Sequence, residues 1–219
     1  MRTPLVIEYY TDILCVWAWI AQRRIDELNN QLGDRIELKH HYLDVFGDAV
    51  NKIPKQWQER GGYHGFSAHV VESASAYEDA PVNADVWSKT RPTSSANPHL
   101  VLKAIALVYS QQHSIDLALK FRQAFFIEAK DISNLDVLFA IIESANLDSN
   151  QVNKAIIDGS AMAALIQDYQ QSKALALKGS PSYIIDNSRQ TLYGNVGYRV
   201  LLANIEEHFK NPDNEASWC

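Results

Sequence analysis

The sequence contains little cysteine, and this limits what can hold the fold together. Its 219 residues include two cysteines, Cys15 and Cys219, and the second is the last residue of the chain. Two cysteines so far apart cannot form the dense disulfide framework of small secreted domains. We therefore expect a fold that depends on its hydrophobic core, in a compartment that keeps thiols reduced.

Long apolar runs and clusters of positive charge are also missing. No stretch approaches the roughly 20 apolar residues that a membrane-spanning helix needs, and the first residues lack the pattern of a secretory signal. The formal net charge is −6, the sequence pI is about 5.6, and no basic run stands out. These absences argue against a nucleic-acid or anionic-membrane surface. We expect a soluble, cytoplasmic protein.

The seven histidines do not form metal-ligand pairs. His64 and His69 are five residues apart, and His40 and His41 would point to opposite faces of a strand. No cysteine lies near them to complete a zinc site. We expect neither a metal site nor a bound cofactor.

The most informative stretch is a short apolar run that leads into a helical pattern. Leu5–Tyr10 is mostly apolar, residues 11–14 interrupt it, and one helical stripe follows, formed by Ala21, Ile25, Leu28 and Leu32. This arrangement places Cys15 in the first turn of a helix. The unpaired N–H groups and partial positive charge of a helix N-terminus favour the thiolate, which is the reactive form of cysteine. The alternative is that Cys15 is a small buried hydrophobic residue.

The rest of the chain has two parts with different patterns. Alternation over residues 36–43 predicts a second strand, so the start is a right-handed βαβ unit with parallel strands. Residues 97–173 have helical periodicity with short connections, including predicted N-caps at Asn97 and Asp148 and a break near Gly159.

The last part reads as a hairpin and a helix. Residues 182–185 and 190–193 are predicted strands. The final helix spans 198–209, with four residues expected to face inward: Val200, Leu201, Ile205 and Phe209. The assembled order is β-α-β, a helical insertion, then β-β-α. This α/β order is that of a thioredoxin fold with an inserted all-helical domain.

Three segments carry a resemblance to a known family. Asp12–Trp19 resembles the D-x-x-C-P-W-C/S-Y segment of DsbA-like thioredoxin-fold proteins, and Lys178–Tyr183 resembles their G-V-P-S/T-F segment, whose proline is cis. Glu128–Ser133, followed by Val137 and Leu138, is similar to a stretch of the inserted domain in one cytoplasmic branch. That branch includes 2-hydroxychromene-2-carboxylate isomerases and class kappa glutathione transferases. The resemblance implies a thioredoxin-like domain of residues 1–43 and 174–219 and an inserted helical domain of residues 44–173.

The departures from the family pattern bear on the chemistry. Redox members have a second cysteine where this chain has Ala18 and a proline where it has Val16, so no internal C-x-x-C disulfide can form. The isomerase and kappa branches have serine at the position of Cys15. A single thiolate can still attack a disulfide and form a mixed disulfide that an external thiol such as glutathione resolves. Cys219 is a second, internal candidate for that resolving step.

The resemblance implies a role for four more residues. Pro181 would lie beside Cys15, the backbone of Ser180 would pair with substrate or glutathione, and Trp17 would form an apolar wall. Asn195, in a turn before the last helix, would receive the γ-glutamyl part of glutathione. The alternatives are a proline that starts a strand, a core tryptophan, and a turn with a helix cap.

Three functions follow from this interpretation. The first is a DsbA-like thiol–disulfide oxidoreductase that uses Cys15 alone, with glutathione as cosubstrate. The second is a non-redox glutathione-dependent isomerase or transferase. The third is a thioredoxin-like binding module whose catalytic site has decayed. Relatives in the glutathione-using branch often dimerise, so a homodimer is a further expectation.

Overall fold

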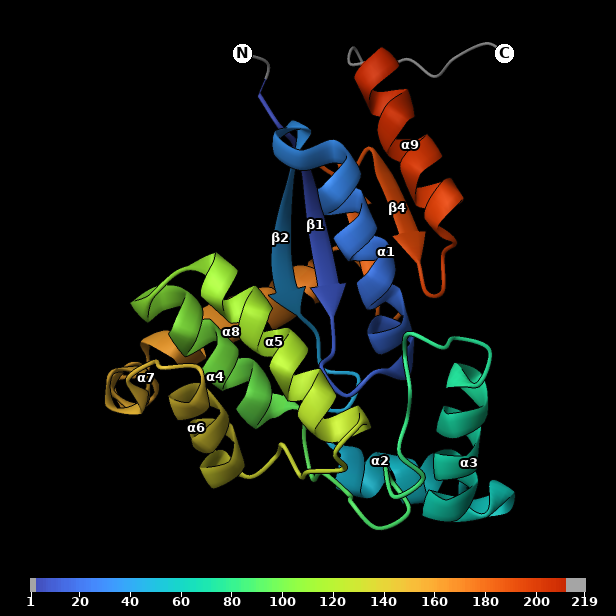
Figure 1. The fold of residues 1–219 in the computed structure, drawn as a ribbon, viewed down its shortest axis with the longest axis vertical. Coiled ribbons are helices and arrows are strands. Elements are labelled where there is room, and N and C mark those ends of the chain that lie inside the picture. Colours follow the sequence, from blue (N-terminus) through green and yellow to red (C-terminus); the bar gives the residue numbers. More distant parts are fainter. Residues whose placement is uncertain (1–2, 212–219) are drawn as a thin grey trace.

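The computed structural model describes residues 3–211, and Cys219 lies outside this range. Its centre is a four-stranded sheet in the order β2-β1-β3-β4 (Figure 1). The strands are β1 (Leu5–Thr11), β2 (Ile36–Tyr42), β3 (Ser182–Ile185) and β4 (Gln190–Tyr193). β1 pairs with β2 in parallel and with β3 antiparallel, and β3 pairs antiparallel with β4. This is the thioredoxin arrangement that the sequence predicts.

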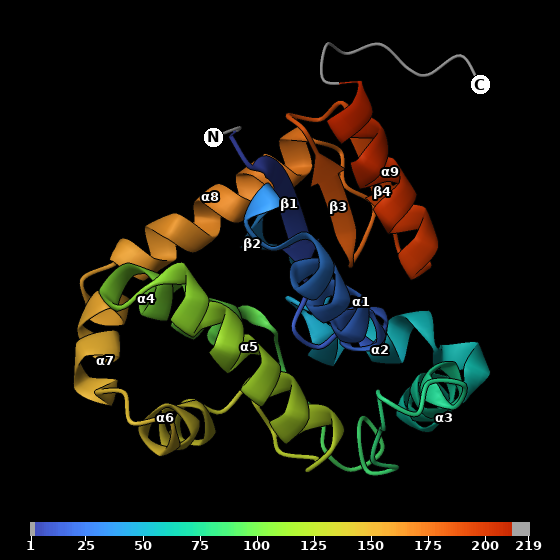
Figure 2. The ribbon, with the colours of Figure 1, turned by 45° about the horizontal axis from the view of Figure 1, so that its top comes forward.

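Helices cover both faces of the sheet. On one face, α1 (Val16–Leu32) and α9 (Tyr198–Lys210) pack on the inward side chains of β1, with Ile25 and Leu201 in the same buried cluster as Tyr9. On the other face, α8 (Ser160–Ala174) crosses behind the sheet (Figure 2). Because side chains alternate along a strand, Tyr9 and Tyr10 face opposite layers.

The segment between β2 and β3 is helical and forms the broad lower part of the molecule in Figure 1. Its helices before α8 are α2 (Ala49–Gln56), α3 (Gly62–Ala74), α4 (Ala96–Val108), α5 (Gln111–Phe126), α6 (Leu135–Ser144) and α7 (Ser149–Ile157), and the chain also has 3₁₀ turns at Gly33–Arg35 and Gln58–Arg60. They enclose an aromatic core in which Trp87 contacts Phe46, Phe66 and Phe125. That core continues into α1 through Trp19, which stacks on Phe126.

Helix boundaries agree with the sequence patterns at some caps and differ at one. Asp148 caps α7 by accepting the N–H of Asn150 at 2.9 Å, and Gly159, with a φ of 85°, separates α7 from α8. Asn97, in contrast, is not an N-cap. α4 begins at Ala96 with Ser95 as its N-cap, two residues before the predicted cap. Ser94 Oγ accepts the N–H of Ala96 at 2.9 Å, and the Asn97 amide donates to the carbonyl of Ser133.

Of the four residues predicted to face inward on α9, one faces solvent. Leu201 and Ile205 are buried, but Val200 is 51% exposed. Adjacent helical residues are separated by about 100° of rotation, so a narrow contact with the sheet buries Leu201 and leaves Val200 in solvent.

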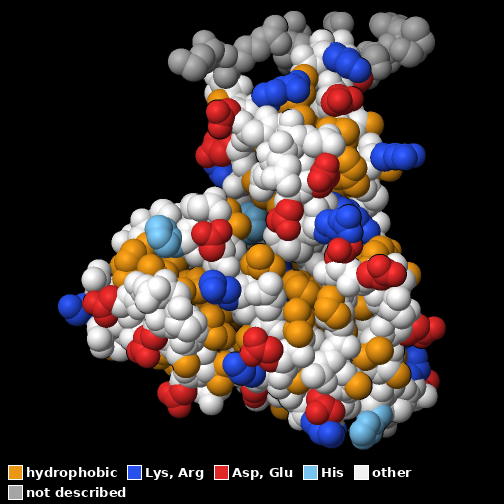
Figure 3. Space-filling model, in the orientation of Figure 1, with side chains coloured by type: hydrophobic (Ala, Val, Ile, Leu, Met, Phe, Trp, Pro, Cys, Tyr) orange, Lys and Arg blue, Asp and Glu red, His pale blue; other side chains and the backbone are white. Residues whose placement is uncertain are grey.

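Two features of the structure can be set beside the composition: the signs of the surface charges and the character of the helices. Acidic and basic side chains are interspersed over the face seen in Figure 3. Within residues 3–211, no helix has both the length and the apolar character to cross a membrane.

Candidate functional site

Cys15 occupies the N-cap position of α1. Its backbone is extended, with φ −81° and ψ 119°, and its carbonyl accepts the N–H groups of Ala18 and Trp19 at 3.1 Å each. Its own N–H donates to the carbonyl of Asp12 at 3.1 Å. These bonds fix the cysteine between the end of β1 and the first helical turn, as the sequence pattern predicts.

Ser180 and Pro181 lie directly beside this cysteine. The peptide bond between them is cis, and the Cys15 thiol donates to the carbonyl oxygen of Ser180, with Sγ and O 3.2 Å apart. The Ser180 hydroxyl oxygen accepts the backbone N–H of Asp12 at 2.9 Å. The structure therefore brings together Cys15 and the Ser180–Pro181 pair, whose first residue is 165 positions away, as the sequence analysis expects.

The ionisation of Cys15 differs from the sequence-based expectation. The side chain is only 6% exposed, and burial raises the pKa of its thiol. Hydrogen bonds from the Ser180 side chain and from the amides of Ala18 and Trp17 lower this pKa, whereas the charge of Asp12 raises it further. Loss of hydration thus outweighs the helix N-terminus, and the resting cysteine is a neutral thiol.

Asp12 organises the loop that carries Cys15. Its carboxylate is fully buried and accepts three hydrogen bonds: from the N–H of Leu14 at 2.9 Å, the N–H of Phe46 at 2.8 Å and the hydroxyl of Ser95 at 2.8 Å. Burial raises its pKa to about 6, although these bonds act in the opposite direction. In the sequence analysis, Asp12 is only the first residue of the Asp12–Trp19 motif, and no function is predicted for it.

His99 supports the same loop from α4. Its Nε2 accepts the N–H of Ile13 at 3.0 Å, so the neutral ring carries its proton on Nδ1, which donates to the Tyr169 hydroxyl at 3.2 Å. The ring also stacks on Tyr42 with centroids 4.7 Å apart, and burial lowers the pKa of His99 to about 3. Sequence reasoning missed this role because nothing in the mostly apolar helix that contains His99 marks a partner 86 residues away.

The two remaining predicted residues have other partners. Trp17 is half-buried and packs against the aromatic core of the insertion. Asn195 is exposed, accepts a hydrogen bond from Arg24 at 2.6 Å and donates to the Tyr77 hydroxyl at 2.8 Å. These bonds connect Asn195 to α1 and to the loop after α3 rather than to Cys15.

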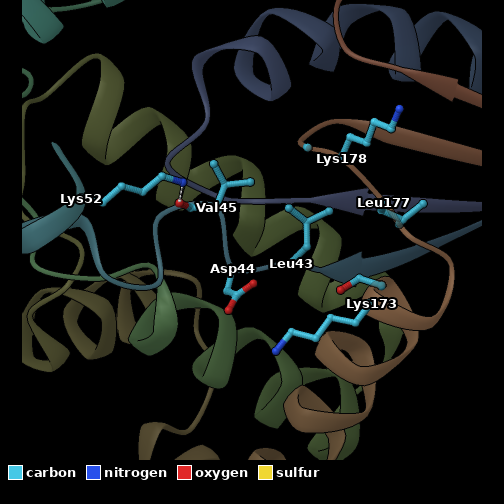
Figure 4. Close-up of a pocket in the computed structure, with 9 residues that line it drawn as sticks. Leu43, Asp44, Val45, Lys52, Lys173, Leu177 and Lys178 are labelled. Atoms are coloured by element: carbon cyan, nitrogen blue, oxygen red, sulfur yellow. Dashed lines mark hydrogen bonds between the residues drawn. The ribbon is translucent and has the colours of Figure 1, made fainter. Parts of the chain in front are cut away.

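A cavity of about 260 Å³ adjoins the loop that contains Ser180 (Figure 4). Its lining comes from the segment after β2, from α2, from the end of α8 and from the loop before β3: Leu43, Asp44, Val45, Lys52, Ser172, Lys173, Leu177, Lys178 and Gly179. Lys52 donates to the Val45 carbonyl. Lys173 and Lys178 form no ion pair with any residue that the structure describes. Three lysines and one carboxylate, that of Asp44, therefore line the cavity, which gives it a positive formal charge.

The described residues, 3–211, show no arrangement typical of a metal site. No three His, Cys, Asp or Glu side chains converge there in a way that could hold an ion.

Known proteins share this architecture. The curated relative ClpXP adapter protein SpxH from Halalkalibacterium halodurans is 24% identical over 216 residues, covering 94% of this chain and 68% of SpxH. Cytosolic disulfide reductase DsbM from Pseudomonas aeruginosa has a TM-score of 0.69 at 18% identity, covering 91% of this chain and 98% of DsbM, and a structure of DsbM with GSH is also similar. 2-Hydroxychromene-2-carboxylate isomerase has a TM-score of 0.61 at 12% identity, covering 96% of this chain and all of that protein.

At these identities, the solved structures establish a shared fold and no more. Family membership rests on the sequence itself. The family model described as DSBA-like thioredoxin domain matches residues 6–206, which include both halves of the sheet, the helical insertion, Cys15 and Pro181. The resemblance seen in the three sequence segments is thereby confirmed: the chain belongs to the DSBA-like thioredoxin domain family.

Proposed function

We propose that this protein catalyses thiol–disulfide exchange through Cys15 alone, with glutathione as the small thiol that completes the cycle. The observation that carries the proposal is the position of the Cys15 sulfur at a helix N-terminus, 3.2 Å from the Ser180 carbonyl beside cis-Pro181. This geometry presents one sulfur next to a backbone segment that an extended substrate can pair with.

The exchange needs two attacks on sulfur. Cys15 loses its proton and attacks one sulfur of a disulfide, so the old S–S bond breaks, a mixed disulfide forms on Cys15 and one thiolate leaves and is protonated. Glutathione thiolate then attacks the mixed disulfide. Attack on the Cys15 sulfur releases the second substrate thiol and leaves glutathione on Cys15, whereas attack on the substrate sulfur regenerates Cys15 and leaves glutathione on the substrate. In either case a second glutathione breaks the remaining mixed disulfide, and glutathione disulfide is formed. Ala18 stands where a resolving cysteine would be, so in the proposed cycle glutathione, an external thiol, breaks the mixed disulfide.

The lysine-rich cavity supports glutathione as the cosubstrate. Glutathione carries two carboxylates, and Lys52, Lys173 and Lys178 line a cavity that Gly179 also borders, one residue from Ser180. Ammonium groups attract carboxylates most strongly where water is partly excluded. The likeness to DsbM, which is described as a cytosolic disulfide reductase and has a structure with GSH, agrees with this choice and with a cytoplasmic location.

Mass spectrometry tests this proposal. The reduced protein is incubated with glutathione disulfide and examined as intact protein and as peptides, with Cys15→Ser and Cys219→Ser as the matched pair. We expect a glutathione adduct on Cys15 that reduced glutathione removes, retained in Cys219→Ser and absent in Cys15→Ser. An adduct confined to Cys219, or an unmodified Cys15, contradicts the proposal.

One observation favours a second function, glutathione-dependent isomerisation or transfer without redox change. The resting Cys15 is a neutral thiol that acts as a hydrogen-bond donor, and such a donor could stabilise the thiolate of bound glutathione. Cys15→Ser separates the two functions, because serine keeps the donor but cannot form a disulfide. Isomerase activity would survive this change, whereas exchange would be lost.

The similarity to SpxH, named as an adapter protein, corresponds to the third hypothesis, a binding module. In that case Cys15→Ser would leave partner binding unchanged and the wild type would show no turnover with disulfides.

A further inference from the structure

The cavity of Figure 4 contains two opposite charges that are not paired with each other. The Lys173 side chain extends across the cavity toward the side where the Asp44 carboxylate lies. The other two lysines differ, because Lys178 points away from this pair and Lys52 donates to a backbone carbonyl. Neither Asp44 nor Lys173 forms an ion pair with any residue of 3–211. Both charges are therefore open to a ligand.

Two walls of the cavity are bonded to the loop that carries the reactive sulfur. The wall with Asp44 continues to Phe46, whose N–H donates to the Asp12 carboxylate at 2.8 Å. Another wall ends one residue before Ser180, whose hydroxyl accepts the Asp12 N–H at 2.9 Å. The carbonyl oxygen of the same Ser180 lies 3.2 Å from the Cys15 sulfur. The cavity is therefore a neighbour of the site of exchange.

Glutathione is long enough to reach from the sulfur into this cavity. An extended chain spans about 3.3–3.6 Å per residue, so a tripeptide spans about 10 Å. Its thiol is on the middle residue, and the γ-linkage lengthens the glutamyl arm by two methylene groups. The border of the cavity, at Gly179, is one residue from the carbonyl that contacts the Cys15 thiol. A glutathione joined to Cys15 can therefore place one end in the cavity.

The pair of opposite charges distinguishes the two ends of glutathione. The glycine end has a carboxylate alone, whereas the γ-glutamyl end has an ammonium and a carboxylate on one carbon. A site that offers a free carboxylate and a free ammonium complements the second end, since each ligand charge then meets an opposite charge. At the glycine end, the Asp44 carboxylate would have no cation to bind and would repel the ligand.

We propose that the cavity binds the γ-glutamyl end of glutathione, with Asp44 accepting hydrogen bonds from its ammonium group and Lys173 donating to its carboxylate. The two residues determine which thiol or disulfide is preferred and take no part in the attack on sulfur. The inference rests on the proposed function, in which glutathione exchanges with Cys15. It assigns to this cavity the group that the sequence analysis expects at Asn195.

The rate of adduct formation on Cys15 tests this assignment. Three disulfides are compared by mass spectrometry of quenched samples, in a Cys219→Ser background: glutathione disulfide and the disulfides of two analogues. Glutaryl-cysteinylglycine lacks the ammonium of the γ-glutamyl end, and γ-aminobutyryl-cysteinylglycine lacks its carboxylate. We expect the parent protein to react about threefold faster with glutathione disulfide than with either analogue, which is the effect of an exposed ion pair.

Each substitution should remove one of the two preferences. Asp44→Asn should lower the preference over the analogue without the ammonium from about threefold to about one, and should keep the other preference. Lys173→Gln should do the reverse. The matched controls are Asp116→Asn on α5 and Lys154→Gln on α7, two exposed positions outside the cavity. They change the net charge by the same amounts and should keep both preferences.

Equal rate constants for the three disulfides in the parent protein would overturn the assignment. So would preferences that persist in Asp44→Asn and Lys173→Gln, or that Asn195→Ala removes instead. Hydroxyethyl disulfide, which has no charged group, separates this failure from failure of the proposed function. An adduct on Cys15 with this disulfide supports exchange chemistry whatever the preferences are, whereas the absence of an adduct with every disulfide rejects exchange and the assignment together.

Discussion

The two faces of the central sheet handle buried charge in opposite ways. On the α8 face, Asp168 accepts hydrogen bonds from the Lys103 ammonium at 2.8 Å, from His41 Nδ1 at 3.0 Å and from the Tyr42 N–H at 2.9 Å. The other ring nitrogen of His41 contacts the Glu8 carboxylate. On the α1 face, Arg122 has two neutral partners and no acid among the described residues.

The paired charges on the α8 face have a structural role. Asp168 and Lys103 belong to the helical insertion, whereas His41 and Tyr42 belong to the sheet, so the paired network joins the two parts. A charge whose partners are all present has no capacity left for a reacting group. Arg122, in contrast, donates to two neutral side chains, Gln22 and Thr11, and its Nε has no hydrogen-bond partner.

Removing the centre of the paired network should give the largest effect. Asp168→Ala leaves Lys103, His41 and the Tyr42 amide without their common acceptor in a site where Asp168 is 3% exposed. We expect the free energy of unfolding to fall by about 3–5 kcal/mol, measured by urea denaturation. The exposed Asp116→Ala is the control and should change it by less than about 0.5 kcal/mol. A similarly small loss for Asp168→Ala would show that the network around Asp168 does not stabilise the fold.

The pH dependence of Asp12 should give an intermediate effect. Its pKa is raised to about 6 in the folded protein, above the value of about 3.9 for an unfolded aspartate. The folded state therefore binds more protons between these values, and the stability that Asp12 contributes falls as the pH rises from about 4 to about 6.

The stability difference between wild type and Asp12→Asn should accordingly shrink by about 2–3 kcal/mol across that range, measured by denaturation at each pH. Asp168 should show the reverse sign. Burial raises its pKa, but His41 and Lys103 outweigh burial and hold the pKa below the usual value, so its contribution is lost as the pH falls below about 4. If the contributions of Asp12 and Asp168 to stability changed with pH in the same direction, the expected difference in sign would be contradicted.

The smallest effect on stability is expected at Arg122. Arg122→Met removes a buried charge that has no acid to leave behind, so the gain from losing that charge offsets the two hydrogen bonds that are lost. We expect a change below about 1 kcal/mol in the free energy of unfolding. A loss comparable to that of Asp168→Ala would mean that the charged hydrogen bonds of Arg122 stabilise the fold as strongly as a paired charge does.

The sequence predicts the architecture well because the fold depends on local patterns. Each pattern involves only residues that are close together in the chain: the alternation in residues 36–43, the helical stripe after Cys15 and the turn at Gly159. The positions of Cys15, Ser180 and Pro181 also follow, since two short motifs fix them.

The polar groups around the site could not be predicted in the same way. Asp12, His99 and Arg122 act through partners 34 to 111 residues away, and no local pattern marks such a pair. The neutral state of Cys15 was missed because it depends on how fully the insertion and the loop at Ser180 remove water from the thiol. That burial is a property of tertiary packing, which a helix N-terminus in the sequence does not reveal.

The wide separation of Cys15 from Ser180 also sets an order of events on the ribosome. Cys15 and the two parallel strands are made early, but the residue that receives the thiol's hydrogen bond comes 165 positions later. At roughly 5–20 residues per second, this delay lasts about 10–30 s. A nascent chain therefore carries Cys15 without its hydrogen-bond partner until Ser180 has been synthesised.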